Sequence, residues 1–450
     1  MAPVAWEATV TVREEPELTS ELVERLERST GLRSIGVTDL IAPRRAYHRY
    51  FAPAVPIPPA RQARLDLGCS VHRALGDRLA GEGVLEARVR RPGIVGRIDI
   101  LADVPIEMKT ASSLVAPDKL VALRPDHLEQ LAMYCALVGR PMGRLLTLLS
   151  DESGVADVQA LDVAVRAPDR VLQDMDSRAE RLRAAWAERR PEQLPRCPWY
   201  GRGCEFEEAG VCGCTGEEPR GASTILDEVG PITPRDDVRA RLQPIVSGVV
   251  PRTAPFGLER FREALYPRRA FFDRARPPTE APPAPTSEEV PPPAAPDLFA
   301  RVTEAVESGP PGEVARLPPR SEAPEEEVVG LRGLPLLVRT SRAWARFRPE
   351  EVVSRSPQYA LDLGLRCAVT GADRAFLVIG FERAEATRDR VQALELRFRD
   401  RTPFSRLLRE RSQRLAAALR DGTSLGLTPC PEWMFADCPY RSECGCGGPG

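Results

Sequence analysis

The feature that most constrains the fold of this chain is an internal repeat. Pro-Arg-Arg-Ala-Tyr at 43–47 recurs as Pro-Arg-Arg-Ala-Phe at 267–271, and Cys-Ala-Leu-Val-Gly at 135–139 recurs as Cys-Ala-Val-Thr-Gly at 367–371. The segment 105–110 recurs with several substitutions at 335–340. Each half ends in a Cys-Pro and a Cys-Gly-Cys. Order and spacing agree as well, since Cys135 lies 62 positions before Cys197 and Cys367 lies 63 before Cys430. The pattern predicts one domain duplicated in tandem.

The repeat sets the expected domain boundaries. The first copy spans 1–216 and the second spans 246–450. Between them, 217–245 is rich in Gly, Pro and charged residues and is expected to be a linker. Within the second copy, 276–296 consists largely of Pro, Glu and Ala, so it cannot bury enough apolar surface to fold and is expected to form an extended insertion.

Hydrophobic periodicity in the first half indicates alternating helices and strands. Helices are expected at 34–50, 66–80, 125–137 and 169–190, and strands at 94–101, 104–110, 143–150 and 158–165. This order predicts an α/β fold in which a mixed sheet is flanked by helices.

Composition limits the environment of the protein. The formal net charge is −2, so any binding of nucleic acid requires a local basic patch or a metal-lined cleft. No apolar run approaches the roughly 18 residues of a membrane helix. The N-terminus also lacks a basic region followed by an apolar stretch, so we expect a cytoplasmic protein with no membrane contact.

Four short motifs of the first half carry polar side chains in a fixed order. Each pattern alone is common in proteins without activity, because isolated charges usually lie in solvated turns and strands. Their conjunction predicts a catalytic site. The motifs are Gly68-x-x-x-His72, Gly96-Arg97-Ile98-Asp99, Glu107-Met108-Lys109 and Gln130-x-x-x-Tyr134.

The third motif has the alternation of a strand, so Glu107 and Lys109 share one face. Asp99 on a neighbouring strand adds a second carboxylate, and two hard oxygen donors with open positions suit Mg²⁺. His72 adds an imidazole ligand, which makes Mn²⁺ an equally suitable metal. The predicted metal ligands are therefore His72, Asp99 and Glu107.

Lys109 is expected to hold the attacking water, a role that Arg performs poorly because it does not titrate. Only Lys109 and Lys119 are lysines among 63 basic residues, so a lysine at this place is a specific choice. Gln130 and Tyr134 share one helical face and complete the predicted catalytic set beside Asp99 and Glu107.

These motifs resemble the RecB-like branch of the PD-(D/E)XK nucleases over residues 34–216. With the cysteines, the chain is most similar to CRISPR-associated RecB-like exonucleases that carry an iron–sulfur cluster. The resemblance implies a restriction-endonuclease-like fold and cleavage of single-stranded DNA ends with Mg²⁺ or Mn²⁺. It also implies a role in CRISPR spacer acquisition beside integrase proteins, with DNA repair as the other pathway. The alternative is a non-cleaving nucleic-acid-binding subunit of an adaptation or repair complex.

Eight of the 11 cysteines form two groups, and disulfides are rarely stable in a cytosolic protein. The spacing predicts four thiolates on one centre in each group and leaves Zn²⁺ and a [4Fe–4S] cluster both open. The resemblance favours iron–sulfur. The family usually has a cysteine before the first Pro-Arg, where Ala42 and Tyr266 stand here, so we expect a fourth local cysteine to replace it. The groups are Cys197, Cys204, Cys212, Cys214 and Cys430, Cys438, Cys444, Cys446.

The second copy has lost the catalytic side chains. Val and Leu cannot hold a cation, so this half is predicted to be a pseudo-nuclease that serves as a DNA-binding or docking platform. Its arginines are either solvated or placed to grip phosphate in the old cleft. The residues aligned with His72, Asp99, Glu107, Lys109, Gln130 and Tyr134 are Thr303, Val329, Leu337, Arg339, Asp362 and Arg366.

Overall fold

The computed structural model of the protein describes residues 7–28, 34–52, 55–79, 81–151, 154–198, 201, 204–214, 223–247, 260–275, 297–321, 323–324, 326–343, 345–384, 386–431, 434, 440 and 443–444. The insertion expected at 276–296 lies outside these ranges, as do Cys438 and Cys446.

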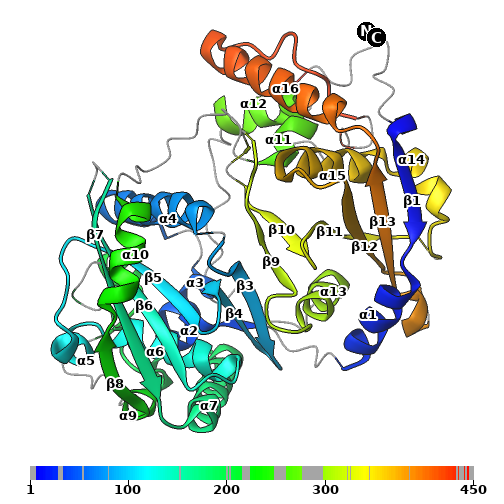
Figure 1. Cartoon of the computed structure of the whole chain (residues 1–450). Coiled ribbons are helices and arrows are strands. Elements are labelled where there is room, and N and C mark those ends of the chain that lie inside the picture. The colour runs from blue at the N-terminus through cyan, green and yellow to red at the C-terminus, as the bar shows by residue number, and fades with distance from the viewer. Residues whose placement is uncertain are drawn as a thin grey trace.

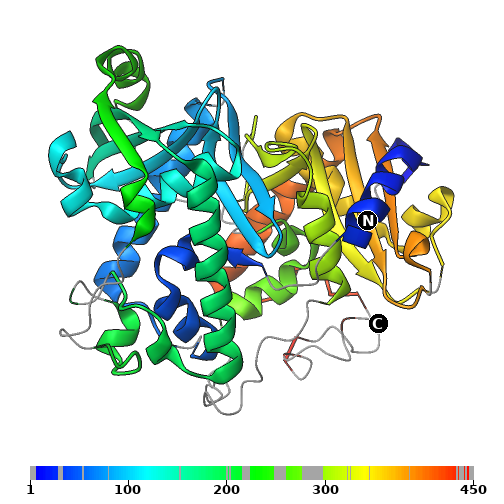
Figure 2. The ribbon, with the colours of Figure 1, turned by 90° about the horizontal axis from the view of Figure 1, so that it is seen from below.

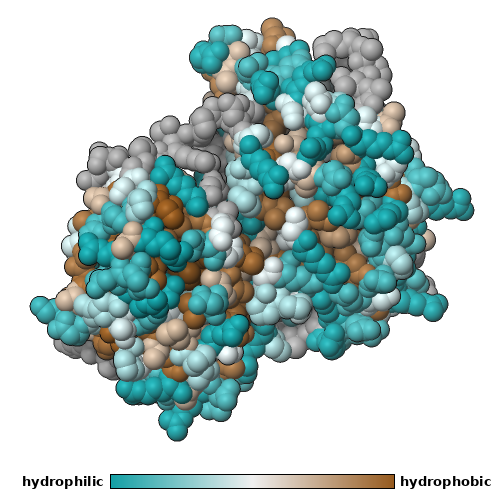
Figure 3. Space-filling view, in the orientation of Figure 1, coloured by the Kyte–Doolittle hydropathy of each residue, from teal (hydrophilic) through white to brown (hydrophobic). Residues whose placement is uncertain are grey.

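The chain forms two lobes (Figure 1), which Figure 2 shows from below. Each lobe is built on one mixed sheet with helices on both faces, which confirms the expected α/β class. The surface on the face shown in Figure 3 is largely hydrophilic, with hydrophobic residues confined to limited patches. In the described part of the chain, every helix is too short or too polar to span a bilayer.

The sheet of the first lobe has the strand order β2-β4-β5-β6-β7-β8, and β3 pairs with β4. The pairs β2–β4 and β5–β6 are parallel, and the other pairs are antiparallel. The strands are β2 (Ile35–Gly36), β3 (Val84–Arg91), β4 (Ile94–Leu101), β5 (Pro105–Ala111), β6 (Met142–Asp151), β7 (Gly154–Val165) and β8 (Val229–Pro234).

Helices α2, α3, α6 and α7 contribute to the core on one face of this sheet, and α4 and α10 contribute to the core on the other. Short helical turns connect the remaining segments. The helices of this lobe are α2 (Val37–Ile41), α3 (Pro43–Phe51), α4 (Pro59–Arg78), η2 (Pro117–Lys119), α5 (Leu120–Leu123), α6 (Pro125–Leu137), α7 (Pro168–Glu188), η3 (Pro191–Gln193), α8 (Glu205–Glu208), α9 (Thr224–Asp227) and α10 (Asp236–Val246).

The sheet of the second lobe has the order β1-β13-β12-β11-β10-β9, in which only β11–β12 is parallel. Helices α11, α12, α15 and α16 pack on one face, and α1 and α13 pack on the other. The strands are β1 (Val10–Glu14), β9 (Val314–Leu317), β10 (Val328–Leu331), β11 (Leu334–Ser341), β12 (Arg374–Phe381) and β13 (Val391–Phe398). The helices are η1 (Glu7–Thr9), α1 (Pro16–Arg28), α11 (Phe261–Leu265), α12 (Pro267–Ala275), α13 (Leu298–Glu307), η4 (Pro349–Glu351), α14 (Val352–Arg355), α15 (Pro357–Thr370), η5 (Thr387–Asp389) and α16 (Thr402–Asp421).

The stretch 217–245, expected to be a linker, is instead largely part of the first lobe. Within it, β8 pairs with β7 at the edge of the sheet, and α10 buries Val238 and Leu242 against the core that α4 also covers. The stretch folds because α10 carries apolar side chains at helical spacing, which cover sheet surface that is otherwise exposed to water.

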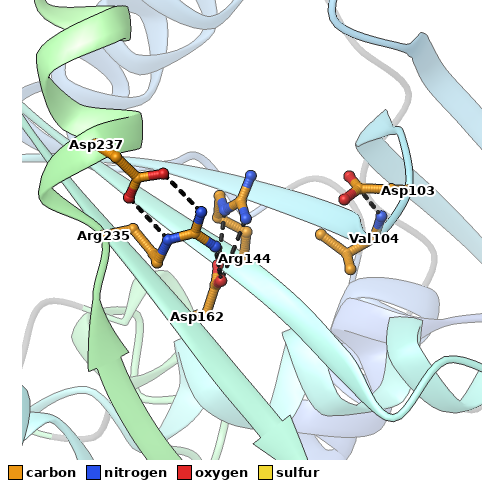
Figure 4. A network of polar contacts seen from close by, with 6 residues as sticks. All are labelled: Asp103, Val104, Arg144, Asp162, Arg235 and Asp237. Carbon is orange, nitrogen blue, oxygen red and sulfur yellow. Dashed lines mark hydrogen bonds and ion pairs between the residues drawn. The ribbon is translucent and has the colours of Figure 1, made fainter.

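A polar network ties this stretch to the sheet (Figure 4). The buried Asp162 on β7 accepts a hydrogen bond from Arg144 of β6 at 2.7 Å and a second one from Arg235, which follows β8. Arg235 also pairs with Asp237 at the start of α10, at 2.7 Å. The two arginines hold the pKa of Asp162 below its ordinary value although burial opposes this. A buried carboxylate is stable here because two cations compensate its lost hydration.

The N-terminal residues also differ from the expected boundary. They precede the first lobe in sequence, but β1 pairs antiparallel with β13 of the second lobe, with Val10 opposite Phe398. Leu18, Leu22 and Leu26 of α1 are buried in the core of that lobe. Because β1 pairs with β13, β13 does not form the edge of the sheet and its backbone groups are protected from exposure.

The lobes meet where β3 and β9 lie side by side (Figure 1). Glu307, the last residue of α13, is buried. Its Oε2 accepts a hydrogen bond from Nε of Arg90 on β3 at 2.8 Å. Arg88 of the same strand lies 3.0 Å from its other oxygen. Two arginines of the first lobe thus compensate one buried carboxylate of the second.

The expected elements of the first half are found, but one expected helix is divided and one further strand is present. The strand 94–101 and the helix 125–137 have the expected bounds. The helix expected at 34–50 is divided after Ile41, because Pro43 lacks a backbone N–H and begins a new helix. Strand β3 is not among the expected elements, although its buried Leu85, Ala87 and Val89 alternate along the chain.

Candidate active site

The four motifs of the first half lie on α4, β4, β5 and α6 around one opening in the sheet. In the register of the sheet, β4 pairs with β2 at Ile94–Ile35 and with β5 at Ile100–Ile106. Beyond Ile106, β4 no longer pairs with β5, and Oδ2 of Asp99 accepts the backbone N–H of Met108 at 2.7 Å. The Asp99 carboxylate therefore occupies the place where two strands separate.

The other motif residues form a hydrogen-bonded chain that runs from the sheet to α6. Nζ of Lys109 donates to Oε1 of Glu107 at 2.5 Å and to Oε1 of Gln130 at 2.9 Å. Nε2 of Gln130 in turn donates to Oη of Tyr134 at 3.2 Å. The sheet and the helix that covers it thus position one amino group between a carboxylate and an amide.

The charges of this group are not balanced. Glu107 is only 2% exposed, and among the described residues its Oε2 is buried without a hydrogen-bond partner. Burial and the nearby Asp99 carboxylate raise the pKa of Glu107. Burial lowers the pKa of Lys109, but Glu107 and Asp99 outweigh it and raise this pKa above its ordinary value. An added cation beside the two carboxylates would stabilise their ionised forms.

Two of the three histidines face this site. His72, the expected metal ligand, lies on α4 near Asp99 and Lys109, and burial lowers its pKa. His127 at the start of α6 was not singled out from the sequence; burial and then the Lys109 charge lower its pKa to about 4. Both imidazoles are therefore neutral at pH 7, the form that binds metals.

A third carboxylate, Glu86 on β3, was also missed in the sequence. Leu85 pairs with Ile100 and Ala87 with Ile98, so the register of β3 on β4 places Glu86 opposite Asp99. Its φ is +48°, an uncommon backbone conformation for a residue with a side chain. Burial raises the pKa of Glu86 to about 7 despite the Arg97 guanidinium 2.7 Å away. Strained residues gather at functional sites, so we count Glu86 as part of this one.

Two motif glycines have a steric explanation. A Cβ on Gly96 would lie 2.9 Å from the Tyr134 ring. The glycine of the second motif therefore leaves room for the tyrosine of the fourth. A Cβ on Gly68 would lie 3.1 Å from Oγ1 of Thr110, where α4 approaches β5. A side chain at Gly96 would force the Tyr134 ring or Val89 to move, whereas one at Gly68 would require only a small shift of the Thr110 side chain.

The first cysteine group is gathered in one small cluster. Cys197, Cys204 and Cys212 are buried with Ala42 and Phe206, and Cys214 packs against them. A hydrogen bond from Cys197, followed by backbone N–H groups, lowers the pKa of Cys204 to about 6. Ala42, which directly precedes Pro43, thus lies beside the cysteines.

Buried polar groups surround this cysteine cluster. Arg44 donates to Sγ of Cys214 at 3.4 Å and to the carbonyl of Leu194 at 2.6 Å. His48 is buried with a hydrogen bond to the Cys212 backbone, and burial lowers its pKa to about 4.

Of the second group, Cys430 and Cys444 are described and buried. Cys430 packs with Tyr266, the counterpart of Ala42. No disulfide joins any two of the nine cysteines in the described ranges. In the same ranges, no set of three or more His, Cys, Asp or Glu side chains is already arranged to hold a metal ion.

The second lobe has no carboxylate at the places of Asp99 and Glu107. Leu101 pairs with Pro105 and Gly330 with Pro335, so Val328, one residue before the aligned Val329, takes the position of Asp99. Leu337 is buried, and Thr303 lies on α13.

The aligned Arg366 is not available to a phosphate group. It pairs with Asp362 at 2.6 Å and with Glu326 at 2.9 Å, and its guanidinium lies over the Phe261 ring. Arg339 pairs with Asp362 at 3.0 Å while its side chain is 40% exposed. Of these two arginines, only Arg339 faces solvent.

Comparison with known proteins adds little. No family model and no curated protein matches the sequence. Among solved structures, the crystal structure of SSO0001 aligns with 44% of this chain and 98% of its own, at 22% identity and a TM-score of 0.29. A similarity this distant carries no argument about fold or function.

Proposed function

We propose that the protein is a RecB-like nuclease of the PD-(D/E)XK type, a metal-dependent exonuclease that acts on single-stranded DNA ends. One observation carries the proposal. Nζ of Lys109 is hydrogen-bonded to Glu107 and Gln130, while the second oxygen of Glu107 is buried without a partner beside Asp99. A protein that only binds DNA has no evident use for this arrangement.

The types of donor at this site suit a hard divalent cation, although no three of them are already arranged around one in the described residues. Asp99 and Glu107 offer carboxylate oxygens, and His72 offers a neutral imidazole. Glu86 adds a further carboxylate opposite Asp99. Mg²⁺ or Mn²⁺ bound here supplies Lewis acidity toward the scissile phosphate.

The residues of the chain supply the remaining functions. Lys109 keeps its proton between two carboxylates and so brings positive charge to the phosphate group. Gln130 fixes the direction of this amino group through its amide oxygen. Tyr134 supports Gln130 from the next turn of α6, and burial raises its pKa well above the ordinary value, so it stays a neutral hydrogen-bonding group.

A matching pair of contacts supports tandem duplication of this nuclease domain. Nη2 of Arg44 donates to the Leu194 carbonyl at 2.6 Å, and Nη2 of Arg268 donates to the Leu427 carbonyl at 2.8 Å. Each acceptor lies three residues before the first cysteine of its group. The two sheets also share one parallel pair with antiparallel neighbours on both sides, β5–β6 in the first and β11–β12 in the second.

We propose that each cysteine group holds a [4Fe–4S] cluster, with Zn²⁺ as the alternative. In the first group, the four cysteines pack together and Arg44 donates a hydrogen bond to Cys214. The pKa of Cys204 is lowered to about 6, whereas burial raises that of Cys212 to about 11. A bound metal would deprotonate such a thiol, and hydrogen bonds stabilise the thiolate charge.

The pathway is proposed from the resemblance of the motifs. It is the trimming of DNA during CRISPR spacer acquisition, with integrase proteins as partners, or end processing in DNA repair. The competing function is a non-cleaving subunit that binds nucleic acid.

The deciding experiment is cleavage of end-labelled single-stranded DNA with Mg²⁺ or Mn²⁺ by the wild type, Lys109→Ala and Asp99→Ala. We expect the wild type to cut and both variants to lose cleavage by roughly 1,000-fold or more, a loss typical of removing a key transition-state contact. Lys119→Ala is the matched control, because Lys119 is the other lysine of the chain and is exposed. A wild type that binds DNA and never cuts with either metal overturns the nuclease proposal and favours the binding subunit.

A further inference from the structure

The second lobe contains a cavity of about 1020 Å³ between α11, α15, β11 and α16. Four arginines and a single aspartate line it, together with two tyrosines. Most of its lining corresponds to a pocket beside α2, α6 and α7 in the first lobe, and Arg339 and Asp362 are the residues aligned with Lys109 and Gln130 of the candidate active site. The lining differs from that site in charge: carboxylates dominate the one and guanidinium groups the other.

The aspartate of the cavity is already compensated. Asp362 is buried and accepts from Arg366 at 2.6 Å as well as from Arg339 at 3.0 Å. Arg366 in turn pairs with Glu326. The Arg339 side chain therefore shares its carboxylate with a second arginine and remains 40% exposed toward the cavity.

The other arginines stand at the wall and the rim of the cavity. Arg411 is a wall residue, because its Nη1 donates to the carbonyls of Ala264 and Leu265. Arg355 is 60% exposed, and within the described residues its ion pair is the 3.3 Å helical one with Glu351. Exposed helical pairs of this kind contribute little, so Arg355 can turn to a stronger anion.

Aromatic faces accompany the arginines. Arg262 is exposed and lies over the Tyr266 ring, with 6.0 Å between its guanidinium and the ring centroid. Tyr359, half-buried on α15, lines the cavity near Arg339. Arginines bind phosphate oxygens through a planar fork, and aromatic rings stack on nucleobases of any sequence. The volume is also that of pockets that hold small ligands.

We propose that this cavity binds a nucleotide unit of single-stranded DNA, with the phosphate group at Arg262, Arg339 and Arg355 and the base at Tyr359. The inference deepens the proposed function, since it gives the second lobe the role of holding the strand that the first lobe cuts. The choice of DNA as the ligand rests on the proposed function, and the location of the binding site rests on the cavity.

The test separates binding from cleavage. Asp99→Asn is the background, metal chelator is present throughout, and a fluorescent 5′-phosphorylated oligodeoxynucleotide is titrated by anisotropy. We expect Arg262→Ala with Arg355→Ala to weaken binding about 10-fold or more, and to lower the salt slope by about 1 to 2, as loss of one or two phosphate contacts does. Tyr359→Ala should weaken binding and Tyr359→Phe should not, because stacking needs the ring and not the hydroxyl group.

Arg388→Ala is the matched control, since this arginine is 84% exposed and lies outside the cavity. Circular dichroism verifies that all variants are folded. Unchanged affinity and salt slope in the double arginine variant overturn the inference even if the wild type cuts DNA. Loss of binding in that variant supports it even if no cleavage is ever seen. Complete competition by a mononucleotide, with no gain in affinity from a longer strand, also overturns it, because the occupant is then a free nucleotide.

Discussion

Nζ of Lys109 lies 2.9 Å from Oε1 of Gln130, and this hydrogen bond joins β5 to the helix that covers it. Gln130 also contacts Tyr134 at 3.2 Å, so the amide holds two groups in place. Residues that orient a charged group affect the rate of a reaction more than the affinity for its substrate.

Replacing Gln130 with Leu, which has a similar volume, should therefore lower the cleavage rate by roughly 10-fold to 100-fold, as loss of a positioning contact does. Affinity for DNA should change little. Single-turnover cleavage and anisotropy measure the two quantities separately. Equal losses of rate and affinity would show that Gln130 binds the strand and does not orient Lys109.

Gly96→Ala should disturb the same site through packing alone. Its Cβ would lie 2.9 Å from both the Tyr134 ring and Val89, so we expect a loss of about 1–3 kcal/mol in the free energy of unfolding, the usual cost of overpacking. Denaturant unfolding measures this. Gly81→Ala serves as the control, because a Cβ at Gly81 meets nothing within 4 Å. Equal stability of the two variants would contradict the packing described here.

The three histidines can be followed one by one by proton NMR. Burial lowers the pKa of His48 and His127 to about 4 and lowers that of His72. Lys109→Ala removes a positive charge near His72 and His127, so their pKa values should rise while that of His48 stays unchanged. Three ordinary titrations near 6.5 in the wild type would contradict the burial of these rings.

The lowered pKa of His127 also predicts a pH dependence of stability. Its folded-state pKa, about 4, lies below the unfolded value of about 6.5, so the unfolded state takes up its proton first as the pH falls. The contribution of neutral His127 is complete above pH 6.5 and is lost between pH 6.5 and 4, by at most about 3 kcal/mol. The stability of the wild type should fall by this amount relative to that of His127→Asn as the pH drops through this range. Parallel curves would rule the effect out.

Asp162→Ala should destabilise the first lobe by about 3–5 kcal/mol, because Arg144 and Arg235 would be left without their buried carboxylate. Asp237→Ala, at the exposed end of the same network, should cost much less. The midpoint of urea unfolding gives both values. A small effect at Asp162 would mean that 229–246 is held on the sheet by apolar contacts alone.

The cysteine proposal is tested by metal content after anaerobic purification. We expect iron, acid-labile sulfide and visible absorbance in the wild type, and a loss of about half of each in Cys204→Ser. Cys69→Ser is the control, because Cys69 is exposed on α4 and belongs to neither group. Colourless protein loaded with zinc would replace the iron–sulfur proposal and leave the nuclease proposal intact.

The sequence alone determined the elements that carry the candidate site. Glu107 and Lys109 share a strand face and Gln130 and Tyr134 share a helix face because the periods of the two structures are local properties of the backbone. Residue type determined the chemistry for the same reason: a Glu-x-Lys on a strand offers a carboxylate and an amine wherever the strand lies. The α/β class followed from the same patterns.

Only the tertiary structure decided which elements meet. Glu86 joins Asp99 through the register of β3 on β4, and residues 10–14 pair with 394–398, far along the chain. No local pattern marks such partners, because strand pairing and helix docking depend on the total apolar surface that the whole chain can bury. The same holds for 229–246, which reads as a polar linker until the sheet that it covers is known.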